Sequence, residues 1–183
     1  MAYLIFAERT LKVRDLGCLL LQENIAYDIT NKGPAIIFQH GFLSNRLSWH
    51  GLAFVDAFKD QYTVICIDSL GHGDSDKPDD AELYVRQQRA ADVIAVLDAE
   101  GIEKAHYVGY SMGGWLGIGC LAHYENRLVS LTIGGFDPFT SGAEGLADIS
   151  LGEFLQMTRQ AAAELVEWVT AEVEPGLAEF TAN

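Results

Sequence analysis

The sequence contains little positive charge. Of its 183 residues, 12 are Lys or Arg and 26 are Asp or Glu, which gives a formal net charge of −14. Nucleic acids and anionic membranes both attract clustered basic side chains, and the chain has no such cluster. We therefore expect neither nucleic acid nor a membrane as a partner.

Cysteine is also scarce and widely spaced. The three cysteines, Cys18, Cys66 and Cys120, have no second Cys or His at the intervals typical of metal ligands. We interpret them as small buried hydrophobic residues in a reducing compartment. The sequence predicts no metal site and no cofactor.

Long hydrophobic runs are missing as well. No apolar run approaches the length that spans a bilayer. The apolar start at residues 1–7 has no basic leading segment and is followed at once by Glu8 and Arg9, which is not the pattern of a signal peptide. We expect a cytoplasmic protein whose 183 residues, 49% of them hydrophobic, are enough for one domain with a core.

Short apolar runs alternate with helix-like segments along the chain. Buried strands are predicted at residues 35–39, 62–67, 105–108 and 129–133, with weaker strand patterns at 18–21 and 25–29. Helices are predicted at residues 48–58, 84–100 and 112–124, with Gly101 as the stop of the second. This alternation predicts an α/β domain with a mostly parallel sheet and helices on both faces, which binds ligands beyond the carboxyl ends of its strands.

The pattern changes after Phe136. Small residues dominate from Asp137 onward, and Ser150 with Glu153 forms a capping box ahead of a long amphipathic helix. That helix should end at Pro175. We therefore predict two parts, a core at residues 1–136 and a helical segment at residues 137–183.

A glycine-flanked serine follows the predicted strand at residues 105–108. The segment Gly109-Tyr110-Ser111-Met112-Gly113 reads Gly-x-Ser-x-Gly between a strand and a helix. A serine hydroxyl is a poor nucleophile unless a strained turn exposes it beside a base and beside donors for an oxyanion. The side chains absent at Gly109 and Gly113 would allow such a turn. The string also occurs by chance, so its meaning depends on its surroundings.

Three motifs together resemble the α/β-hydrolase fold family over about residues 25–138. They are His40-Gly41-Phe42 after one strand, residues 68–75 after the next, and residues 109–114, in the family's order and spacing. The resemblance implies that Ser111 is the nucleophile and that the backbone N–H groups of Phe42 and Met112 form an oxyanion hole. It further implies that His40 and Gly41 shape the oxyanion loop and that residues 137–183 belong to a helical cap.

The resemblance supplies no obvious base or acid. The family's acid usually follows the seventh strand and its histidine the eighth, and the chain ends before either position. His123 would lie about 18 Å from Ser111, at about 1.5 Å per helical residue, and His106 is also remote along its strand. Asp137 follows the sixth strand, where a minority of the family carries the acid, and the alternative is a turn residue ahead of Pro138.

These observations leave three hypotheses. The first is the N-terminal part of a serine hydrolase for a small-molecule acyl substrate, such as an ester, catalytically incomplete because the histidine is absent. The second is a shortened, non-catalytic paralogue that serves as a binding or interaction module, and the third is an enzyme completed by a second chain. For the first two we expect the strand at residues 129–133 to be an exposed edge that self-associates or captures a complementing segment. Tyr110, Trp115 and Phe136 suggest an apolar rim, although ordinary core packing explains them equally well.

Overall fold

A computed structural model of the protein describes residues 7–14 and 22–137. Its contacts divide the chain into two units, Met1–Phe136 and Asp137–Asn183. Of the second unit only Asp137 is among the described residues. The strand expected at residues 18–21 and the helical cap expected after Asp137 therefore lie outside the described part of the chain.

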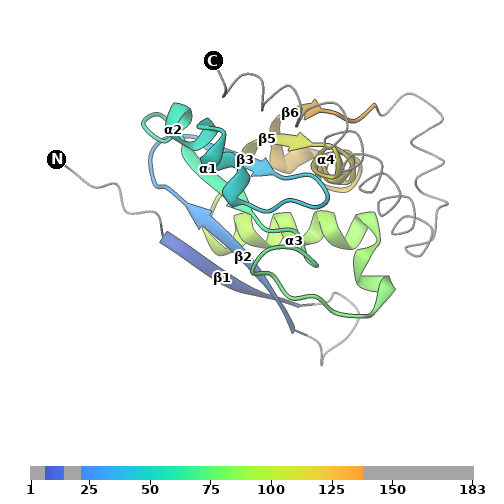
Figure 1. The fold of residues 1–183 in the computed structure, drawn as a ribbon. Coiled ribbons are helices and arrows are strands. Elements are labelled where there is room, and N and C mark those ends of the chain that lie inside the picture. Colours follow the sequence, from blue (N-terminus) through green and yellow to red (C-terminus); the bar gives the residue numbers. More distant parts are fainter. Residues whose placement is uncertain (1–6, 15–21, 138–183) are drawn as a thin grey trace, which may run out of the picture. The chain divides into compact units, whose positions relative to one another are not determined.

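A six-stranded sheet forms the centre of the first unit (Figure 1). The strands lie in the order β1-β2-β4-β3-β5-β6. Four of them run parallel, namely β3 (Ala35–Gln39), β4 (Thr63–Ile67), β5 (Ala105–Tyr110) and β6 (Leu128–Gly134). The other two, β1 (Ala7–Arg14) and β2 (Gln22–Ile29), extend the sheet beyond β4 in antiparallel pairing. The predicted α/β architecture with a mostly parallel sheet is confirmed.

The central strands β3 and β4 are buried along their whole length, because helices cover both faces of the sheet. On one face, alternate strand residues such as Ile37, Ile65 and Tyr107 join a core completed by α3 (Arg86–Ala99) and α4 (Met112–Tyr124). On the other face, the intervening residues Phe38 and Val64 pack with the short helices α1 (Leu47–Gly51) and α2 (Phe54–Phe58). Figure 1 shows α3 and the α1–α2 pair on opposite sides of the strands.

The single helix predicted at residues 48–58 is wrong. The segment forms two short helices, α1 (Leu47–Gly51) and α2 (Phe54–Phe58), separated by Ala53 in the left-handed region at φ 61°. The break brings the rings of Trp49 and Phe54 into edge-to-face contact at 5.1 Å between centroids. Apolar spacing alone could not reveal the break, because both helices turn apolar residues toward the same sheet face.

The next helical segment was predicted almost as it occurs. A short 3₁₀ helix, η1 (Ala81–Tyr84), precedes α3. After the end of α3, Gly101 adopts φ 67°. The predicted glycine stop is therefore confirmed, because a left-handed residue just past the last turn ends an α-helix. A second 3₁₀ turn, η2 (Glu125–Arg127), joins α4 to β6.

Within residues 7–14 and 22–137, no helix is long and apolar enough to cross a membrane. The same residues contain no cluster of His, Cys, Asp or Glu placed to hold a metal ion. Cys66 and Cys120 are free and buried. Burial raises the pKa of Cys120 to about 12, so this thiol is not a reactive nucleophile near neutral pH.

Candidate active site

Ser111 lies on a sharp turn between β5 and α4. Its backbone adopts φ 52° and ψ −113°, a combination that non-glycine residues rarely populate and that costs on the order of 1–3 kcal/mol. The Ser111 amide donates to the carbonyl of Gly134 at 2.7 Å, and its carbonyl accepts from the amide of Gly114 at 2.8 Å. The backbone is thus held from both sides, while the hydroxyl has no hydrogen bond to any other described residue.

Two glycines make this turn sterically feasible. A Cβ on Gly109 would lie 2.3 Å from the carbonyl oxygen of Gly113, and a Cβ on Gly113 would lie 2.2 Å from the carbonyl oxygen of Gln39. Real Cβ atoms essentially never come within 3.0 Å of another heavy atom. The start of α4 therefore approaches both its own strand and the neighbouring β3 more closely than any side chain allows.

The loop that follows β3 lies directly beside Ser111. A Cβ placed on Gly41 would be 3.4 Å from the Cβ of Ser111. The pairing of Gln39 with Gly109 puts the carboxyl ends of β3 and β5 at the same sheet edge. The residues assigned to the oxyanion hole, Phe42 and Met112, follow Gly41 and Ser111 in sequence, so they belong to these two adjoining segments.

His40 is buried, and both of its ring nitrogens are engaged. Nε2 lies 3.1 Å from the amide nitrogen of Ser69, and Nδ1 lies 2.7 Å from the carbonyl oxygen of Gly41. Because a backbone amide only donates, Nε2 accepts and Nδ1 carries the proton. Burial lowers the pKa of His40 to about 4, so the ring is neutral near pH 7 and has no free nitrogen for proton transfer.

The hydrogen bond from His40 fixes the orientation of a catalytic candidate. The carbonyl of Gly41 and the N–H of Phe42 belong to one planar trans peptide and point in opposite directions. By holding the Gly41 oxygen at 2.7 Å, the imidazole also fixes where the Phe42 N–H points. A loop-shaping role for His40 would act through this hydrogen bond.

The loop at residues 68–75 is held by its own polar groups and by an arginine. Asp68 is fully buried and accepts from the amides of Arg46 at 2.6 Å and Asp74 at 2.9 Å. Its carboxylate also pairs with the guanidinium of Arg46. The hydroxyl of Ser75 donates to the carbonyl of Asp68 at 2.7 Å.

The sequence analysis did not identify Arg46 or its ion pair with Asp28. The Arg46 guanidinium also pairs with Asp28 of β2 at 3.0 Å, and both side chains are buried. Nothing in the local sequence signals this contact, because the two residues lie in separate segments and each resembles an ordinary surface charge.

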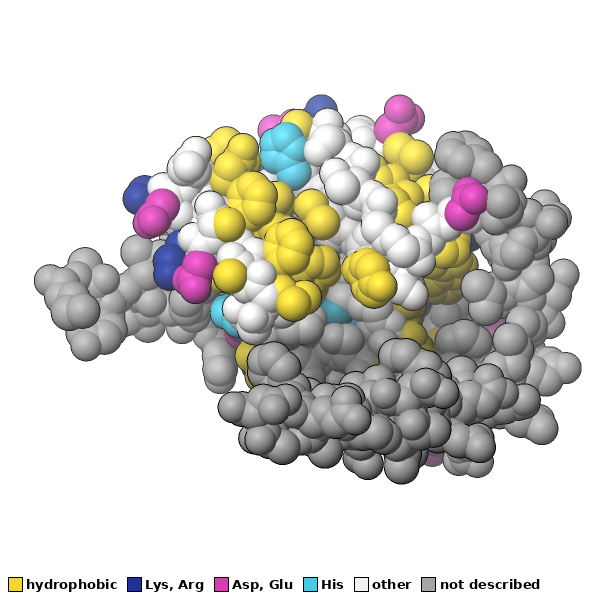
Figure 2. Space-filling model, turned by 45° about the horizontal axis from the view of Figure 1, so that its top comes forward, with side chains coloured by type: hydrophobic (Ala, Val, Ile, Leu, Met, Phe, Trp, Pro, Cys, Tyr) yellow, Lys and Arg dark blue, Asp and Glu magenta, His cyan; other side chains and the backbone are white. Residues whose placement is uncertain are grey.

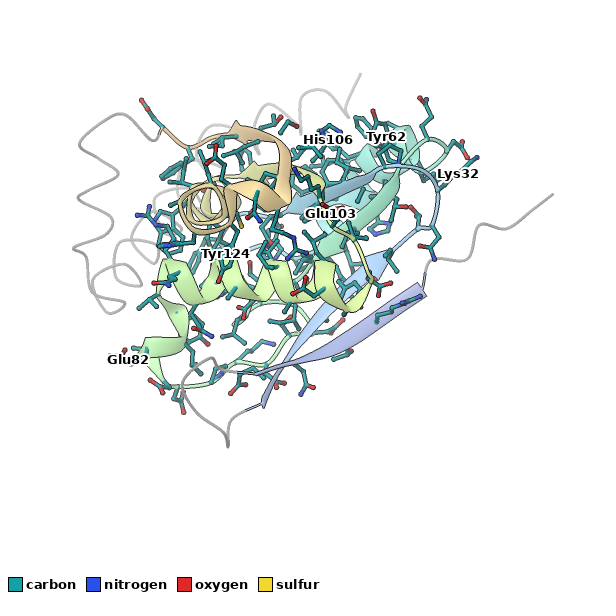
Figure 3. All side chains as sticks on the ribbon, turned by 180° about the vertical axis from the view of Figure 1, so that it is seen from behind. Lys32, Tyr62, Glu82, Glu103, His106 and Tyr124 are labelled. Atoms are coloured by element: carbon teal, nitrogen blue, oxygen red, sulfur yellow. The ribbon has the colours of Figure 1, made fainter. Side chains whose placement is uncertain are left out.

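None of the chain's histidines contacts Ser111 through a hydrogen bond. All five lie within the described residues. His72 packs its ring edge-on against Phe42, at 5.3 Å between centroids, and burial lowers its pKa. Figure 3 shows His106 beside Tyr62, and its Nδ1 lies 2.8 Å from the Ser130 hydroxyl. The remaining two contact other residues, His50 with Asp28 and His123 with Tyr124.

The other predicted site residues occupy different surroundings. Tyr110 is 57% exposed. Trp115 is half-buried beneath the guanidinium of Arg86, and Phe136 packs against Gly114. Asp137 is exposed and belongs to the second unit, so its role as the acid stays a prediction.

Hydrophobic side chains gather on the face of the molecule that carries α1 and α2 (Figure 2). Leu43, which follows the oxyanion candidate Phe42, is 77% exposed and adopts φ 57°. The other large exposed apolar residues of this region are Leu47, Leu52 and Phe54. The loop that follows β3 thus borders an apolar surface.

Comparisons with known proteins identify related sequences and structures. A sequence family described as the alpha/beta hydrolase fold matches residues 34–180. The 3-oxoadipate enol-lactonase 1 of Acinetobacter baylyi is 39% identical over 104 residues, which cover 55% of this chain and 36% of that protein. A putative 2-succinyl-6-hydroxy-2,4-cyclohexadiene-1-carboxylate synthase of Bacillus subtilis is 28% identical over 124 residues, which cover 66% of this chain and 44% of that protein.

Solved structures give the same result. Epoxide Hydrolase A from Mycobacterium thermoresistibile superposes with a TM-score of 0.62 at 26% identity, covering 78% of this chain and 44% of that one. The chain belongs to the α/β hydrolase fold family. It spans less than half the length of these relatives, between 36% and 44%.

Proposed function

We propose that Ser111 is the nucleophile of a serine hydrolase that cleaves a small-molecule acyl substrate such as an ester, thioester or lactone. The observation that carries this proposal is the strained backbone of Ser111, at φ 52° and ψ −113°, next to the loop that begins at Gly41. Such strain persists only where the surroundings enforce it, and it clusters at catalytic residues. An ordinary serine at the start of a helix needs no such conformation.

The arrangement suits acyl transfer. The Ser111 oxygen would form a bond to the carbonyl carbon while its proton passes to a base, and the N–H groups of Phe42 and Met112 would receive the developing oxyanion. Collapse of the tetrahedral intermediate breaks the bond to the leaving oxygen or sulfur, which takes up the proton. Water then attacks the acyl-serine ester, releasing the acid and restoring the hydroxyl.

The chemistry of serine separates this chain from some of its relatives. The proteins similar to it include an enol-lactonase, a fluoroacetate dehalogenase and epoxide hydrolases. Attack by a serine oxygen on a saturated carbon would leave an ether, which offers water no carbonyl to attack. Attack on an acyl group leaves a hydrolysable ester. Ser111 therefore favours acyl substrates, among which a lactone is the kind that the enol-lactonase name describes.

We further propose that the base is a histidine outside these 183 residues. All five histidines of the chain lie in the described part, and none hydrogen-bonds Ser111. Asp137 is the acid candidate within the chain. The complete catalytic group would then need a longer form of this protein or a second chain.

A fluorophosphonate probe tests the nucleophile directly. Covalent labelling that maps to Ser111 by mass spectrometry, and that disappears in Ser111→Ala, is the expected result for a form that contains the base. A matched control is Ser130→Ala, which removes a hydroxyl bonded to His106 and should leave labelling unchanged. Labelling at another residue, or equal labelling of Ser111→Ala, would overturn the proposal.

The second candidate function is a non-catalytic binding or interaction module. The observation that favours it is that none of the five histidines, all in the described residues, hydrogen-bonds the Ser111 hydroxyl. If the 183-residue chain is folded and monodisperse yet remains unlabelled, this chain by itself is not an active hydrolase. If the longer form is also unlabelled, the module is the better account.

A further inference from the structure

The ring of Tyr110 lies between two loops that flank the turn at Ser111. Its Cδ1 atom is 3.3 Å from the position that a Cβ on Gly41 would occupy. On the opposite edge of the ring, Cε2 is 2.7 Å from the Cβ position of Gly135, and Cδ2 is 3.5 Å from that of Gly134. The tyrosine therefore spans the distance from the loop after β3 to the loop after β6.

These contacts join segments that do not pair with each other. In the sheet, β5 separates β3 from β6, so no ladder hydrogen bond fixes the gap between their two following loops. Gly41 and Gly135 each offer bare backbone to one edge of the ring. The ring therefore fills the space between the two loops.

We propose that Tyr110 is a positioning residue that holds the oxyanion loop, residues 40–43, at the correct distance from Ser111. The inference rests on the proposed function of Ser111. His40 fixes the rotation of the Gly41–Phe42 peptide through its 2.7 Å hydrogen bond, and the ring of Tyr110 fixes its lateral position. Both are needed, because an oxyanion donor must lie about 2.7–3.1 Å from the oxygen that it stabilises.

The ring carries this role and the hydroxyl does not. All the close approaches involve ring carbons, and within the described residues the phenol oxygen has no hydrogen-bond partner. The side chain is 57% exposed, so its removal should cost little stability. Replacement by Phe keeps the aromatic ring between the two loops, whereas replacement by Ala removes it.

Inactivation kinetics with the fluorophosphonate probe test the proposal in a form that is labelled. For Tyr110→Phe we expect the maximal rate and the half-saturating probe concentration to stay within about twofold of the parent. For Tyr110→Ala we expect the maximal rate to fall about tenfold or more, as for partial loss of one oxyanion donor, with little change in half-saturation. Leu121→Ala, at a residue 41% exposed on α4, is the control and should match the parent.

The alternative role, direct contact with substrate, predicts the opposite split. Tyr110→Ala would then raise the half-saturating concentration and leave the maximal rate nearly unchanged. That result would overturn the proposal, as would a loss in Tyr110→Phe equal to the loss in Tyr110→Ala.

Amide hydrogen exchange provides a test that needs no activity. We expect the amides of residues 41–43 to exchange faster in Tyr110→Ala than in the parent, and Tyr110→Phe to restore the parent rate. Unchanged exchange in Tyr110→Ala overturns the positioning role. An unlabelled parent would instead count against the proposed function alone, so the two failures are distinguishable.

Discussion

Gly113 has no side chain because backbone of the neighbouring strand occupies the place where one would lie. A Cβ there would be 2.2 Å from the oxygen and 2.8 Å from the carbon of the Gln39 carbonyl. Backbone cannot rotate away as a side chain can, so Gly113→Ala should lower the free energy of unfolding by about 1–3 kcal/mol. It should also slow labelling of Ser111, and urea denaturation with probe kinetics measures both.

Gly51 provides the matched control for that substitution. It ends α1, and no heavy atom lies within 4 Å of its Cβ position. Gly51→Ala should therefore leave stability unchanged or raise it by up to about 1 kcal/mol through the lower entropy of the unfolded chain. Equal stability of the two variants would contradict the close approach of α4 and β3.

His40 should make the folded state sensitive to acid. The pKa of this buried ring is lowered to about 4 from an ordinary 6.5, so between these pH values the unfolded chain takes up a proton and the folded chain does not. Stability from this group is complete above pH 6.5 and is lost as the pH falls toward 4, by about 3 kcal/mol. In His40→Asn this loss should vanish.

The measurement is the difference in unfolding free energy between parent and His40→Asn at several pH values. Other titrating groups contribute equally to both chains and cancel. The unfolding free energy of the parent should exceed that of His40→Asn by the largest amount at pH 7. This excess should shrink by about 3 kcal/mol as the pH approaches 4. A constant difference would show that His40 is not the group that titrates.

For single residues, a contact was predictable from the sequence only where its partners lie close together in the chain. Gly109 and Gly113 flank Ser111 within five residues, so the motif itself specifies the close turn. His40 and Ser69 are separated by 29 residues, and their hydrogen bond exists only because β3 and β4 lie side by side. The family resemblance implied a loop-shaping role for His40, whereas the hydrogen bonds of its ring arise only in the folded chain.

At the scale of elements, the buried strands and α4 were predictable because their apolar patterns are strong. The strand β1 was missed because its sequence, AERTLKVR, mixes charged and apolar residues. A strand at the end of a sheet pairs on one side only and needs no continuous apolar run. The division between α1 and α2 depends on how Trp49 and Phe54 pack against each other, which is tertiary information.

Helix α3 supports the 68–75 loop through one buried ion pair. The Arg89 guanidinium donates to the carbonyl of Leu70 at 2.8 Å and pairs with Asp92 at 3.2 Å. Replacing Arg89 by Met leaves a buried carboxylate without its cation, so we expect a loss of about 3–5 kcal/mol at pH 7.5. Arg89→Met combined with Asp92→Leu should recover much of it, because no buried charge remains.

The pH dependence of the same variants' stability tests whether the ion pair with Asp92 causes this loss. Burial raises the pKa of Asp92 to about 6, opposed by Arg89, and loss of that cation should raise it further. A protonated Asp92 needs no cation, so the cost of Arg89→Met should shrink between pH 7.5 and 5.5, while the cost of the double variant should not. Urea denaturation at both pH values decides this, and equal costs for the single variant would contradict the account.

At the scale of the molecule, the order of the strands creates the site. Because β3 and β5 are neighbours although β4 intervenes in sequence, segments about 70 residues apart meet at Gly41 and Ser111. The alternation of strands and helices was enough to predict the mostly parallel sheet. It could not predict the antiparallel pairing of β1 and β2, which depends on the direction in which the chain enters the sheet.

The same strand order places β6 at one end of the sheet, where it pairs with β5 alone among the described residues. An unpaired edge presents a row of backbone donors and acceptors that a further strand can satisfy. We propose that this edge pairs with a second copy of the chain or with a complementing segment. Val129, on β6 and 56% exposed, should favour the contact, and Val129→Lys should weaken it because pairing would bury a charge.

Light scattering coupled to size exclusion measures the result. We expect the parent chain to be larger than a monomer and Val129→Lys to shift toward the monomer mass. Leu121→Lys is the matched control, because Leu121 is also an exposed apolar residue, at 41%, but lies on α4 away from the strand edge. If only the edge matters, Leu121→Lys leaves the assembly intact. A parent chain that remains monomeric at high concentration would contradict the proposed pairing of the β6 edge.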